Sequence, residues 1–368
     1  MARKTDVFVI GGGPAGLAAA IAARKKGFDV TVADGGKPPI DKACGEGLMP
    51  DAISALADLG IRIQASEGKA FRGIRCISGD SNAAAYFQRG FGIGVRRTVL
   101  HQRMIEEAES CGVKLLWETP ISGLSSEGIL AEGEPTAARW IIGADGGRSL
   151  VRRWSGLDAH GSLQSRFAFR RHYRCRPWSD CVEIYWGRQL QAYVSPVGDE
   201  ETCVVLLTSD PQMRLAAAWR EFPELAERLE GTKPVSKERG AVTAMHSLKN
   251  VVRGNVALIG DASGSVDAIT GEGLRLSFVQ AKILAEALEK QDLQRYQAGH
   301  RRLARRPTAM GRLMLLLDKR PRLRRQTIRA MAADTRILER LLAVHVGEAS
   351  PLHLATGGAL LGLRLLAV

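Results

Sequence analysis

Six consecutive residues near the N-terminus, Gly11-Gly12-Gly13-Pro14-Ala15-Gly16, have the spacing GxGxxG. In such a turn the first glycine allows a sharp bend, the second lets the backbone approach a diphosphate, and the third lets a helix pack on a strand. Asp34 ends the next apolar segment, where a carboxylate can accept hydrogen bonds from a ribose. The pattern predicts a dinucleotide site that is formed by Gly11, Gly13, Pro14, Ala15, Gly16 and Asp34.

Two later regions also combine glycine with acidic residues. An apolar segment at 255–259 runs into Gly260-Asp261, and a second glycine pair follows before a helical pattern at 273–288. Asp261 is placed to bind a ribose-like or ribityl hydroxyl, and the N–H groups at the start of a helix favour phosphate. Asp145-Gly146 follows another apolar strand at 140–143. Taken alone, each of these turns is also compatible with a simple helix cap.

The elements that must position these turns follow from the spacing of apolar residues. Residues 6–10 and 29–33 form short apolar strands on either side of a helical pattern at 14–26, which is typical of a nucleotide-binding βαβ unit. From about 165 to 244 the segments alternate and are rich in β-branched and aromatic residues. That pattern predicts an antiparallel sheet inserted into the first domain, whose buried-strand pattern returns at 255–259.

The order of the three motifs resembles the flavoprotein hydroxylase superfamily, which includes p-hydroxybenzoate hydroxylase-like monooxygenases, flavin-dependent halogenases and geranylgeranyl reductases. There the GxGxxG turn and the later Gly-Asp turn bind FAD, and the Asp-Gly turn serves FAD and a transient nicotinamide coenzyme. The resemblance spans roughly residues 6 to 281. It implies that FAD is bound by the residues named above and by an arginine that starts the next helix. The positions that carry over are Gly11, Gly13, Gly16, Asp34, Arg97, Asp145, Gly146, Gly260 and Asp261.

The segment at 41–48 most resembles the geranylgeranyl reductase branch, in which a Lys-x-Cys-Gly stretch borders the flavin. The resemblance implies that Lys42, Cys44 and Gly45 contact the cofactor. A thiol beside a flavin can act on substrate or protonate a carbanion, although a cysteine there can also be a small residue that simply fits. Ala268 stands where the superfamily usually has proline, and 191–196 only loosely matches the sheet motif of the reductases. This chain also resembles the geranylgeranyl reductase branch at Gly271, Glu272 and Gly273.

We therefore expect an α/β fold with a discontinuous Rossmann-type FAD-binding domain at 1–164 and 251–292. An inserted antiparallel β-sheet domain at 165–250 is expected to bind substrate, and 293–368 to form a helical, basic C-terminal region. The aromatic side chains that we expect to roof the flavin and contact a small apolar substrate are Tyr185, Trp186 and Tyr193. Because the sequence contains no second GxGxxG, NAD(P)H is expected to act only as a transient reductant.

Three functions remain open at this point. The first is a monooxygenase that uses reduced flavin and O2 to hydroxylate an apolar aromatic or polyketide-like substrate. The alternative is a geranylgeranyl-reductase-like enzyme that reduces alkene bonds of a prenyl or lipid-like substrate, which Cys44 and Glu272 favour. The loose match to the reductase motif at 191–196 and the abundance of monooxygenases in the superfamily favour the monooxygenase. A non-catalytic flavin-binding or membrane-docked protein is the third.

The net charge of +13 is concentrated near the C-terminal end, where 301–329 holds eleven basic residues and one acidic residue. Such a run is either a solvated helical face or a patch for peripheral membrane contact. No aromatic residue interleaves the arginines, so we expect no nucleic-acid partner. The six cysteines form no CxxC pair, no spacing typical of metal ligands occurs, and we see neither a signal peptide nor a membrane-spanning run. These features predict a cytoplasmic protein.

Overall fold

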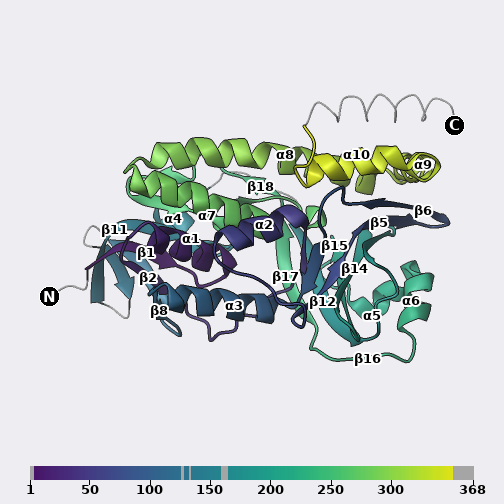
Figure 1. Ribbon diagram of the computed structural model, residues 1–368, viewed down its shortest axis with the longest axis horizontal. Coiled ribbons are helices and arrows are strands. Elements are labelled where there is room, and N and C mark those ends of the chain that lie inside the picture. Colours follow the sequence, from purple (N-terminus) through teal and green to yellow (C-terminus); the bar gives the residue numbers. More distant parts are fainter. Residues whose placement is uncertain (1–3, 126–127, 132–133, 159–164, 351–368) are drawn as a thin grey trace.

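The computed structural model describes residues 4–125, 128–131, 134–158 and 165–350 (Figure 1). It combines a largely parallel sheet, a largely antiparallel sheet and a series of helices at the C-terminal end. This arrangement confirms the α/β fold class expected from the sequence. The apolar stretch at 357–368 lies outside the described residues.

The first large sheet has the strand order β19, β20, β11, β1, β2, β8, and its neighbours are parallel except for β19 and β20. The parallel strands therefore follow the succession of a Rossmann fold, in which the first strand lies in the middle. Strands β9 and β10 extend this sheet antiparallel from β11. The bounds are β1 (Lys4–Ile10), β2 (Val30–Ala33), β8 (Lys114–Leu116), β9 (Ile121–Ser125), β10 (Gly128–Ala131), β11 (Glu134–Gly143), β19 (Val252–Arg253) and β20 (Val256–Leu258).

Strand β1 is apolar on both faces, since Val7, Phe8 and Val9 are all buried. Such a continuous apolar run is typical of a strand that helices cover on both sides of a parallel sheet. One cover is α1 (Pro14–Lys25), in which a run of alanines lets the helix pack closely against the sheet and against α7 (Gly273–Glu289). The glycine-rich turn between β1 and α1 is thereby held at the carboxyl ends of the parallel strands.

The second large sheet has the order β16, β12, β15, β14, β13, β5, β6, with β17 also paired to β12. All its pairs are antiparallel except β13 with β5. Strands β5 and β6 thus join this sheet from residues 73–86, well before the other strands in the chain. The bounds are β5 (Gly73–Ser78), β6 (Ser81–Tyr86), β12 (Ser165–Arg174), β13 (Cys181–Trp186), β14 (Leu190–Gly198), β15 (Glu201–Thr208), β16 (Lys233–Pro234) and β17 (Arg239–Ala244).

Two small sheets link the large ones. One has the order β3, β7, β4 and the other pairs β18 with β21. Their bounds are β3 (Gly47–Leu48), β4 (Gly68–Phe71), β7 (Gly92–Val95), β18 (His246–Ser247) and β21 (Gly264–Ser265). The remaining helices are α2 (Pro50–Asp58), α3 (Arg97–Ser110), α4 (Leu150–Trp154), α5 (Leu215–Ala218), α6 (Pro223–Leu229), α8 (Leu293–Lys319), α9 (Pro321–Ala333) and α10 (Thr335–His345), with short 3-10 turns η1 (Trp219–Glu221), η2 (Gly260–Ser263) and η3 (Ala268–Thr270).

The C-terminal helices lie over both halves of the molecule. Helix α8 packs on α7, and α9 and α10 pack on β6, so that the three helices run along one side in Figure 1. Buried side chains of α9 and α10, such as Met331, Ile337 and Leu342, form a separate apolar cluster with residues of β6. Within the described residues, no helix combines the length and apolar character needed to cross a lipid bilayer.

Candidate active site

A cavity of about 1130 Å³ is lined by residues from both large sheets and from the loops between them. Most residues predicted to bind cofactor line it: Gly11, Gly13, Pro14, Ala15, Asp34, Lys42, Cys44, Gly45, Arg97, Asp145, Gly146, Asp261, Gly271 and Gly273. Of the predicted substrate residues, Tyr193 lines it as well. Segments that are distant in the sequence therefore meet around one space that is large enough for a dinucleotide and a substrate.

The glycine-rich turn has the geometry that its spacing predicts. Gly11 has a positive φ of 110°, and a Cβ there would lie 2.5 Å from the Ala144 carbonyl oxygen. A Cβ on Gly16 would lie 1.8 Å from the Gly11 carbonyl oxygen, because helix and strand are packed closely at this point. A Cβ on Gly13 would meet nothing within 4 Å. The backbone is thus crowded on the sheet side and open beside the cavity, as a diphosphate site requires.

Two side chains hold this turn in place. The Asp34 carboxylate accepts hydrogen bonds from the N–H groups of Gly12 at 2.6 Å and Gly36 at 2.7 Å. His101 of α3 is buried and its Nε2 lies 2.8 Å from the Gly12 carbonyl oxygen, while its Nδ1 accepts from the Ile40 N–H. Nε2 must therefore carry the proton, and burial lowers the pKa of His101, which keeps the ring neutral. The sequence pattern gave no partner for His101, because α3 reaches the turn only in the folded chain.

Asp145 caps a helix at the edge of the cavity. Its carboxylate accepts hydrogen bonds from the Ser149 hydroxyl and from the N–H groups of Leu150 and Val151 at the start of α4. This is the simple cap that the sequence left open, and the adjacent Gly146, with a φ of 81°, still lines the cavity. A cofactor contact at this turn would therefore come from its backbone.

Two basic residues, Lys42 and Arg97, line the cavity together with the glycine-rich turn. The Nε of Arg97 is buried and has no hydrogen-bond partner among the described residues, although Arg97 lines the cavity. Lys42 and Asp261 form an ion pair at 3.2 Å between the 41–48 segment and η2. An unpaired guanidinium beside a helix N-terminus suits an anionic group, so the residues present fit the diphosphate of FAD.

Cys44 lies on the cavity wall in a segment that Glu46 anchors. The Glu46 backbone has a φ of 58°, a left-handed conformation that residues other than glycine rarely adopt. Its N–H donates to the Cys44 sulfur at 3.4 Å, and its carbonyl oxygen accepts from the Val95 N–H at 2.8 Å. The orientation of the thiol is therefore set by Glu46, a residue that our sequence analysis did not select.

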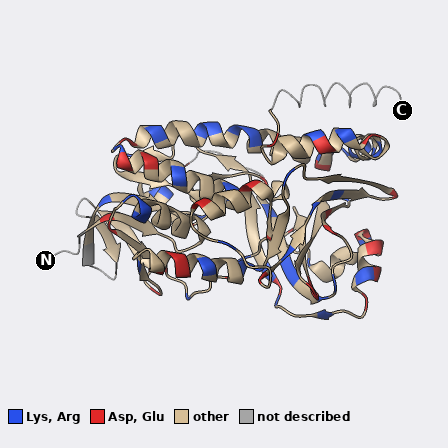
Figure 2. Ribbon diagram, in the orientation of Figure 1, with Lys and Arg blue, Asp and Glu red and all other residues tan. Residues whose placement is uncertain are grey.

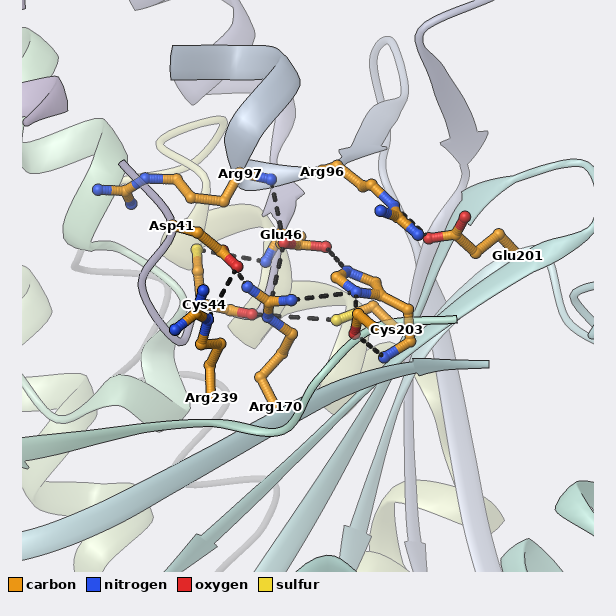
Figure 3. A network of polar contacts seen from close by, with 11 residues as sticks. Asp41, Cys44, Glu46, Arg96, Arg97, Arg170, Glu201, Cys203 and Arg239 are labelled. Atoms are coloured by element: carbon orange, nitrogen blue, oxygen red, sulfur yellow. Dashed lines mark hydrogen bonds and ion pairs between the residues drawn. The ribbon is translucent and has the colours of Figure 1, made fainter. Parts of the chain in front are cut away.

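The Glu46 carboxylate joins three parts of the molecule (Figure 3). One oxygen accepts from the N–H of Arg97, the first residue of α3, at 3.0 Å, and the other lies 2.6 Å from His172 Nε2 on β12. Arg170, also on β12, lies 3.8 Å from Glu46 and pairs with Asp41. We call Asp41, Glu46, Arg170 and His172 the Glu46 network. It ties the Cys44 segment both to the sheet and to the arginine that faces the cofactor space.

The protonation of His172 follows from its partners. Arg170 Nη1 lies 3.0 Å from His172 Nδ1, and a guanidinium can only donate. Nδ1 must therefore be an acceptor, so the proton of the ring lies on Nε2 and points at Glu46. This arrangement balances the buried carboxylate with a guanidinium and a neutral donor, as buried charges require.

The same region contains the one group of potential metal ligands found among the described residues, Glu46, His172 and Cys203, whose ligand atoms lie within 4.8 Å of one another. A cation there would face the Arg170 guanidinium, and His172 Nε2 already donates to Glu46. Burial, and after it the Glu46 carboxylate, raises the pKa of Cys203 well above its usual range. A protonated thiol is a poor ligand, so we assign no metal to this group.

The substrate side of the cavity is mainly apolar. Strand β12 contributes Ala168, β13 contributes Ile184, β15 contributes Leu207 and β17 contributes the partly exposed Val242. These side chains exclude water from the part of the cavity that faces Cys44, and they favour an apolar ligand.

Five of the residues predicted for the site do not line the cavity. Tyr185 lies on the opposite face of its strand from Ile184, as the alternation of a strand requires, and its hydroxyl donates to Glu183 at 2.7 Å. Trp186 packs beneath the Arg324 guanidinium instead. Gly16 and Gly260 lie so close to neighbouring atoms that an added Cβ would clash with the Gly11 carbonyl oxygen or with the Ala15 side chain.

Glu272 is the fifth of these residues. It is buried and pairs with Arg275, and it also lies near Arg306 and His345 in the C-terminal helices. It therefore joins the loop at 271–273 to α8 and α10, while the flanking Gly271 and Gly273 line the cavity.

Over residues 4–305 the chain matches the family described as FAD binding domain. It is 30% identical to a menaquinone reductase of Mycobacterium tuberculosis, over 79% of this chain and 78% of that protein. It is 27% identical to digeranylgeranylglycerophospholipid reductase 1 of Methanothermobacter thermautotrophicus, over 83% of each chain. A 3-demethoxyubiquinol 3-hydroxylase of Escherichia coli is 24% identical over 78% of this chain and 80% of its own.

The fold is also shared with solved structures. A flavoprotein/dehydrogenase from Cytophaga hutchinsonii superposes with a TM-score of 0.80 at 21% identity, covering 94% of this chain and 93% of that one. The family match confirms FAD as the cofactor, and the relatives confirm an oxidoreductase. The chain therefore belongs to the FAD-binding domain family, and its relatives include a hydroxylase and a geranylgeranyl-type reductase, the two kinds of enzyme that its motifs resemble.

Proposed function

We propose that the enzyme reduces an alkene bond of a prenyl or lipid-like substrate. The observation that carries this proposal is the position of Cys44, whose thiol lies on the wall of a largely apolar cavity beside the cofactor-binding turns. The relatives named as reductases of menaquinone and of a digeranylgeranyl phospholipid support it. The preference differs from the first expectation of the sequence analysis, which was a monooxygenase.

Saturation of a carbon–carbon double bond requires a hydride at one carbon and a proton at the other. Reduced FAD supplies the hydride when it is bound. The Cys44 S–H gives its proton to the second carbon, whose π electrons form the new C–H bond, and the sulfur keeps the S–H pair. The Glu46 N–H, 3.4 Å from this sulfur, stabilises the thiolate until water returns a proton.

The second sheet serves as the substrate wall in this proposal. Ala168, Ile184 and Leu207 bind the apolar chain by removing it from water, and they keep water from the reacting carbons. Residues 165–250 would then hold the substrate, and 1–164 with 251–292 would hold FAD. Tyr193 borders the same space, and burial raises the pKa of its hydroxyl well above the usual range, so it stays protonated.

Replacing Cys44 tests the assignment. In the flavin-loaded enzyme, Cys44→Ser is expected to lower the rate of anaerobic alkene reduction by about 100-fold to 10,000-fold, the usual contribution of a proton donor. The flavin spectrum and content should not change. Cys175→Ser, at a cysteine that does not line the cavity, is the matched control. Substrates with a geranylgeranyl chain are incubated with prereduced enzyme, and mass spectrometry measures the gain of two hydrogen atoms. Equal rates for both variants would exclude Cys44 as the donor.

Hydroxylation is the second candidate, because one relative is named as a hydroxylase. The two reactions differ in their need for O2. A reductase forms product from prereduced enzyme under anaerobic conditions, whereas a monooxygenase forms none until O2 is admitted, and its product then gains one oxygen atom. Product that appears only with O2 would overturn the reductase proposal.

We further propose NAD(P)H as the external reductant and a reducing, cytoplasmic compartment. All six cysteines are free, which supports such a compartment. The coenzyme would bind transiently near the Asp145-Gly146 turn, where backbone groups border the cavity. Anaerobic loss of the flavin absorbance on addition of NADH or NADPH checks this proposal, and a flavin that neither coenzyme reduces would contradict it.

A further inference from the structure

Helix α8 carries a continuous row of exposed basic residues. At the three- and four-residue spacing that keeps side chains on one helix face, Arg295, Arg302, Arg305, Arg312 and Lys319 are all exposed. The positions between them on this face are the exposed Ala298, Ala309 and Leu316. We call these eight residues the α8 stripe. Because the stripe runs from Arg295 to Lys319 along α8, it extends over about 36 Å.

Little in the chain neutralises the α8 stripe. The acidic residue within α8, Asp318, lies off the stripe and accepts a hydrogen bond from the Gln191 amide at 2.7 Å. Arg295, at one end, contacts Asp292 at 3.4 Å, whereas no ion pair of Arg302, Arg305 or Arg312 occurs within the described part of the chain. The residues at 351–368 contain no Asp or Glu side chain. Figure 2 shows the blue segments spaced along this helix at the outside of the molecule.

We propose that the α8 stripe docks on the surface of an anionic phospholipid bilayer. A row of guanidinium groups matches lipid phosphates and attracts a negatively charged leaflet. Leu316 is 47% exposed within the row and can enter the headgroup region, where an amphipathic helix places its apolar side chains. Alanine at two other positions allows the helix backbone to approach the surface.

Other partners fit the stripe less well. Single-stranded nucleic acid is usually held by aromatic side chains between basic ones, and the stripe contains no aromatic residue. A second copy of the chain would bring its own net charge of +13, so pairing through this face would be repelled. The inference does not depend on the proposed reaction, because docking is measured without turnover.

The experiment compares two triple variants of the flavin-loaded full chain. Arg302→Gln, Arg305→Gln and Arg312→Gln together remove charge from the α8 stripe. Arg174→Gln, Lys233→Gln and Lys237→Gln remove the same charge from exposed residues at the other side of the molecule, near β16 in Figure 1. Co-sedimentation is measured with vesicles of phosphatidylglycerol and phosphatidylcholine mixed, and with phosphatidylcholine alone. Retained flavin and an unchanged melting temperature show that each variant is folded.

We expect the parent chain and the control variant to bind the anionic vesicles and not the neutral ones. The stripe variant should bind about 100-fold more weakly, at about fivefold for each basic side chain near an anionic surface. Leu316→Ser should lower binding several-fold further, which purely electrostatic binding to an acidic polymer would not show. Equal binding by both triple variants, or tighter binding of single-stranded oligonucleotide than of anionic vesicles, would overturn the proposal.

Discussion

The glycine-rich turn at 11–16 and the Glu46 network border the same cavity but are built in different ways. The turn is made by neighbouring residues between β1 and α1, and its glycines bend the chain locally. The Glu46 network joins residues from the 41–48 segment and from β12, and Glu46 and His172 are 126 positions apart in the chain. One region is specified by spacing, whereas the other exists only because the fold brings its members together.

Because of this difference, the two regions should be disrupted by different kinds of substitution. The turn has almost no polar side chains and is sensitive to volume, because an added methyl group would strike backbone. The Glu46 network has ordinary side-chain volumes and is sensitive to charge, because each buried ion depends on its partner. Substitutions that change volume and substitutions that change charge should therefore separate the two regions.

The largest effect is expected at Gly16. Gly16→Ala places a Cβ 1.8 Å from the Gly11 carbonyl oxygen, so the main chain must move. We expect a loss of about 5 kcal/mol in the free energy of unfolding, at the extreme of single substitutions, together with loss of bound flavin. Urea unfolding and the flavin content of the purified protein measure both effects.

Gly13→Ala is the matched control, because a Cβ there meets nothing within 4 Å and the φ of −70° suits any residue. Its stability should stay within about 1 kcal/mol of the parent, with weaker FAD binding as the main change. Equal destabilisation by both alanines would show that crowding on the sheet side does not set the geometry of the turn.

The sequence predicted the turn and the strands and helix on either side of it because those signals are local. Hydrophobic runs and glycine spacing are written in consecutive residues, so the βαβ unit and most cavity-lining glycines were identified. Arg170 and His172 lie within an alternating strand, where a basic residue normally indicates the solvent face. Nothing near Arg170 and His172 in the sequence indicates that Glu46 packs against their face of β12. Their burial could therefore not be predicted from the pattern.

Tyr185 lies away from the cavity for a related reason. The alternation of β13 places Ile184 and Tyr185 on opposite faces, but only the packing of α5 and α6 against the sheet decides which face is which. The sequence pattern of a strand therefore predicts that its side chains alternate, but it does not predict which of the two faces lines the cavity. To decide which face of β13 lines the cavity, one would need to know which way a side chain of a neighbouring strand points.

The second effect in size is expected at Glu46. Glu46→Ala removes the acceptor of the His172 N–H and leaves the buried Arg170 guanidinium with Asp41 as its carboxylate partner, which should cost about 3–5 kcal/mol. Because the same change frees the Cys44 segment, turnover should fall further than stability explains. Urea unfolding gives the first quantity and anaerobic turnover of the folded fraction gives the second.

Two comparisons sharpen this test. Glu109→Ala, at an exposed glutamate of α3, should change stability by less than about 0.5 kcal/mol. Adding Arg170→Met to Glu46→Ala should cost less than the sum of the two single changes, because the guanidinium that Glu46 helps to balance is removed with it. Strict additivity would contradict the coupling that the contacts imply.

A third test asks whether the local motifs also depend on distant side chains. His300 of α8 lies 2.9 Å from the Ser263 hydroxyl in the second glycine-rich loop, and burial lowers the pKa of His300 to about 4. The folded state therefore binds this proton more weakly than the unfolded chain, whose histidine titrates near pH 6.5. Stability from the neutral ring is present above about pH 6.5 and is lost progressively as the pH falls towards 4.

His300→Gln removes this titration. Between pH 7 and pH 4 the parent should lose about 3 kcal/mol more stability than the variant, from the size of the shift. Urea unfolding at several pH values measures the difference. Parallel pH profiles for the two proteins would mean that His300 is not held neutral against the loop.

The smallest effect is expected at Asp51, in a second group of charges that distant segments bring together. Asp51 lies 3.1 Å from Arg275 and 3.7 Å from Arg306, yet burial raises the pKa of Asp51 to about 6, with a further contribution from Glu272. A carboxyl group with a raised pKa lowers stability as the pH rises, whereas a paired acid with a lowered pKa increases it. The reason is that the folded state disfavours the charged form of Asp51. The cost appears as the pH rises from about 4 through 6, so Asp51→Asn should gain about 2 kcal/mol on the parent between pH 4 and pH 7. Thermal unfolding of both proteins across this range measures the gain. If Asp51→Asn instead loses stability relative to the parent as the pH rises, the two arginines outweigh burial.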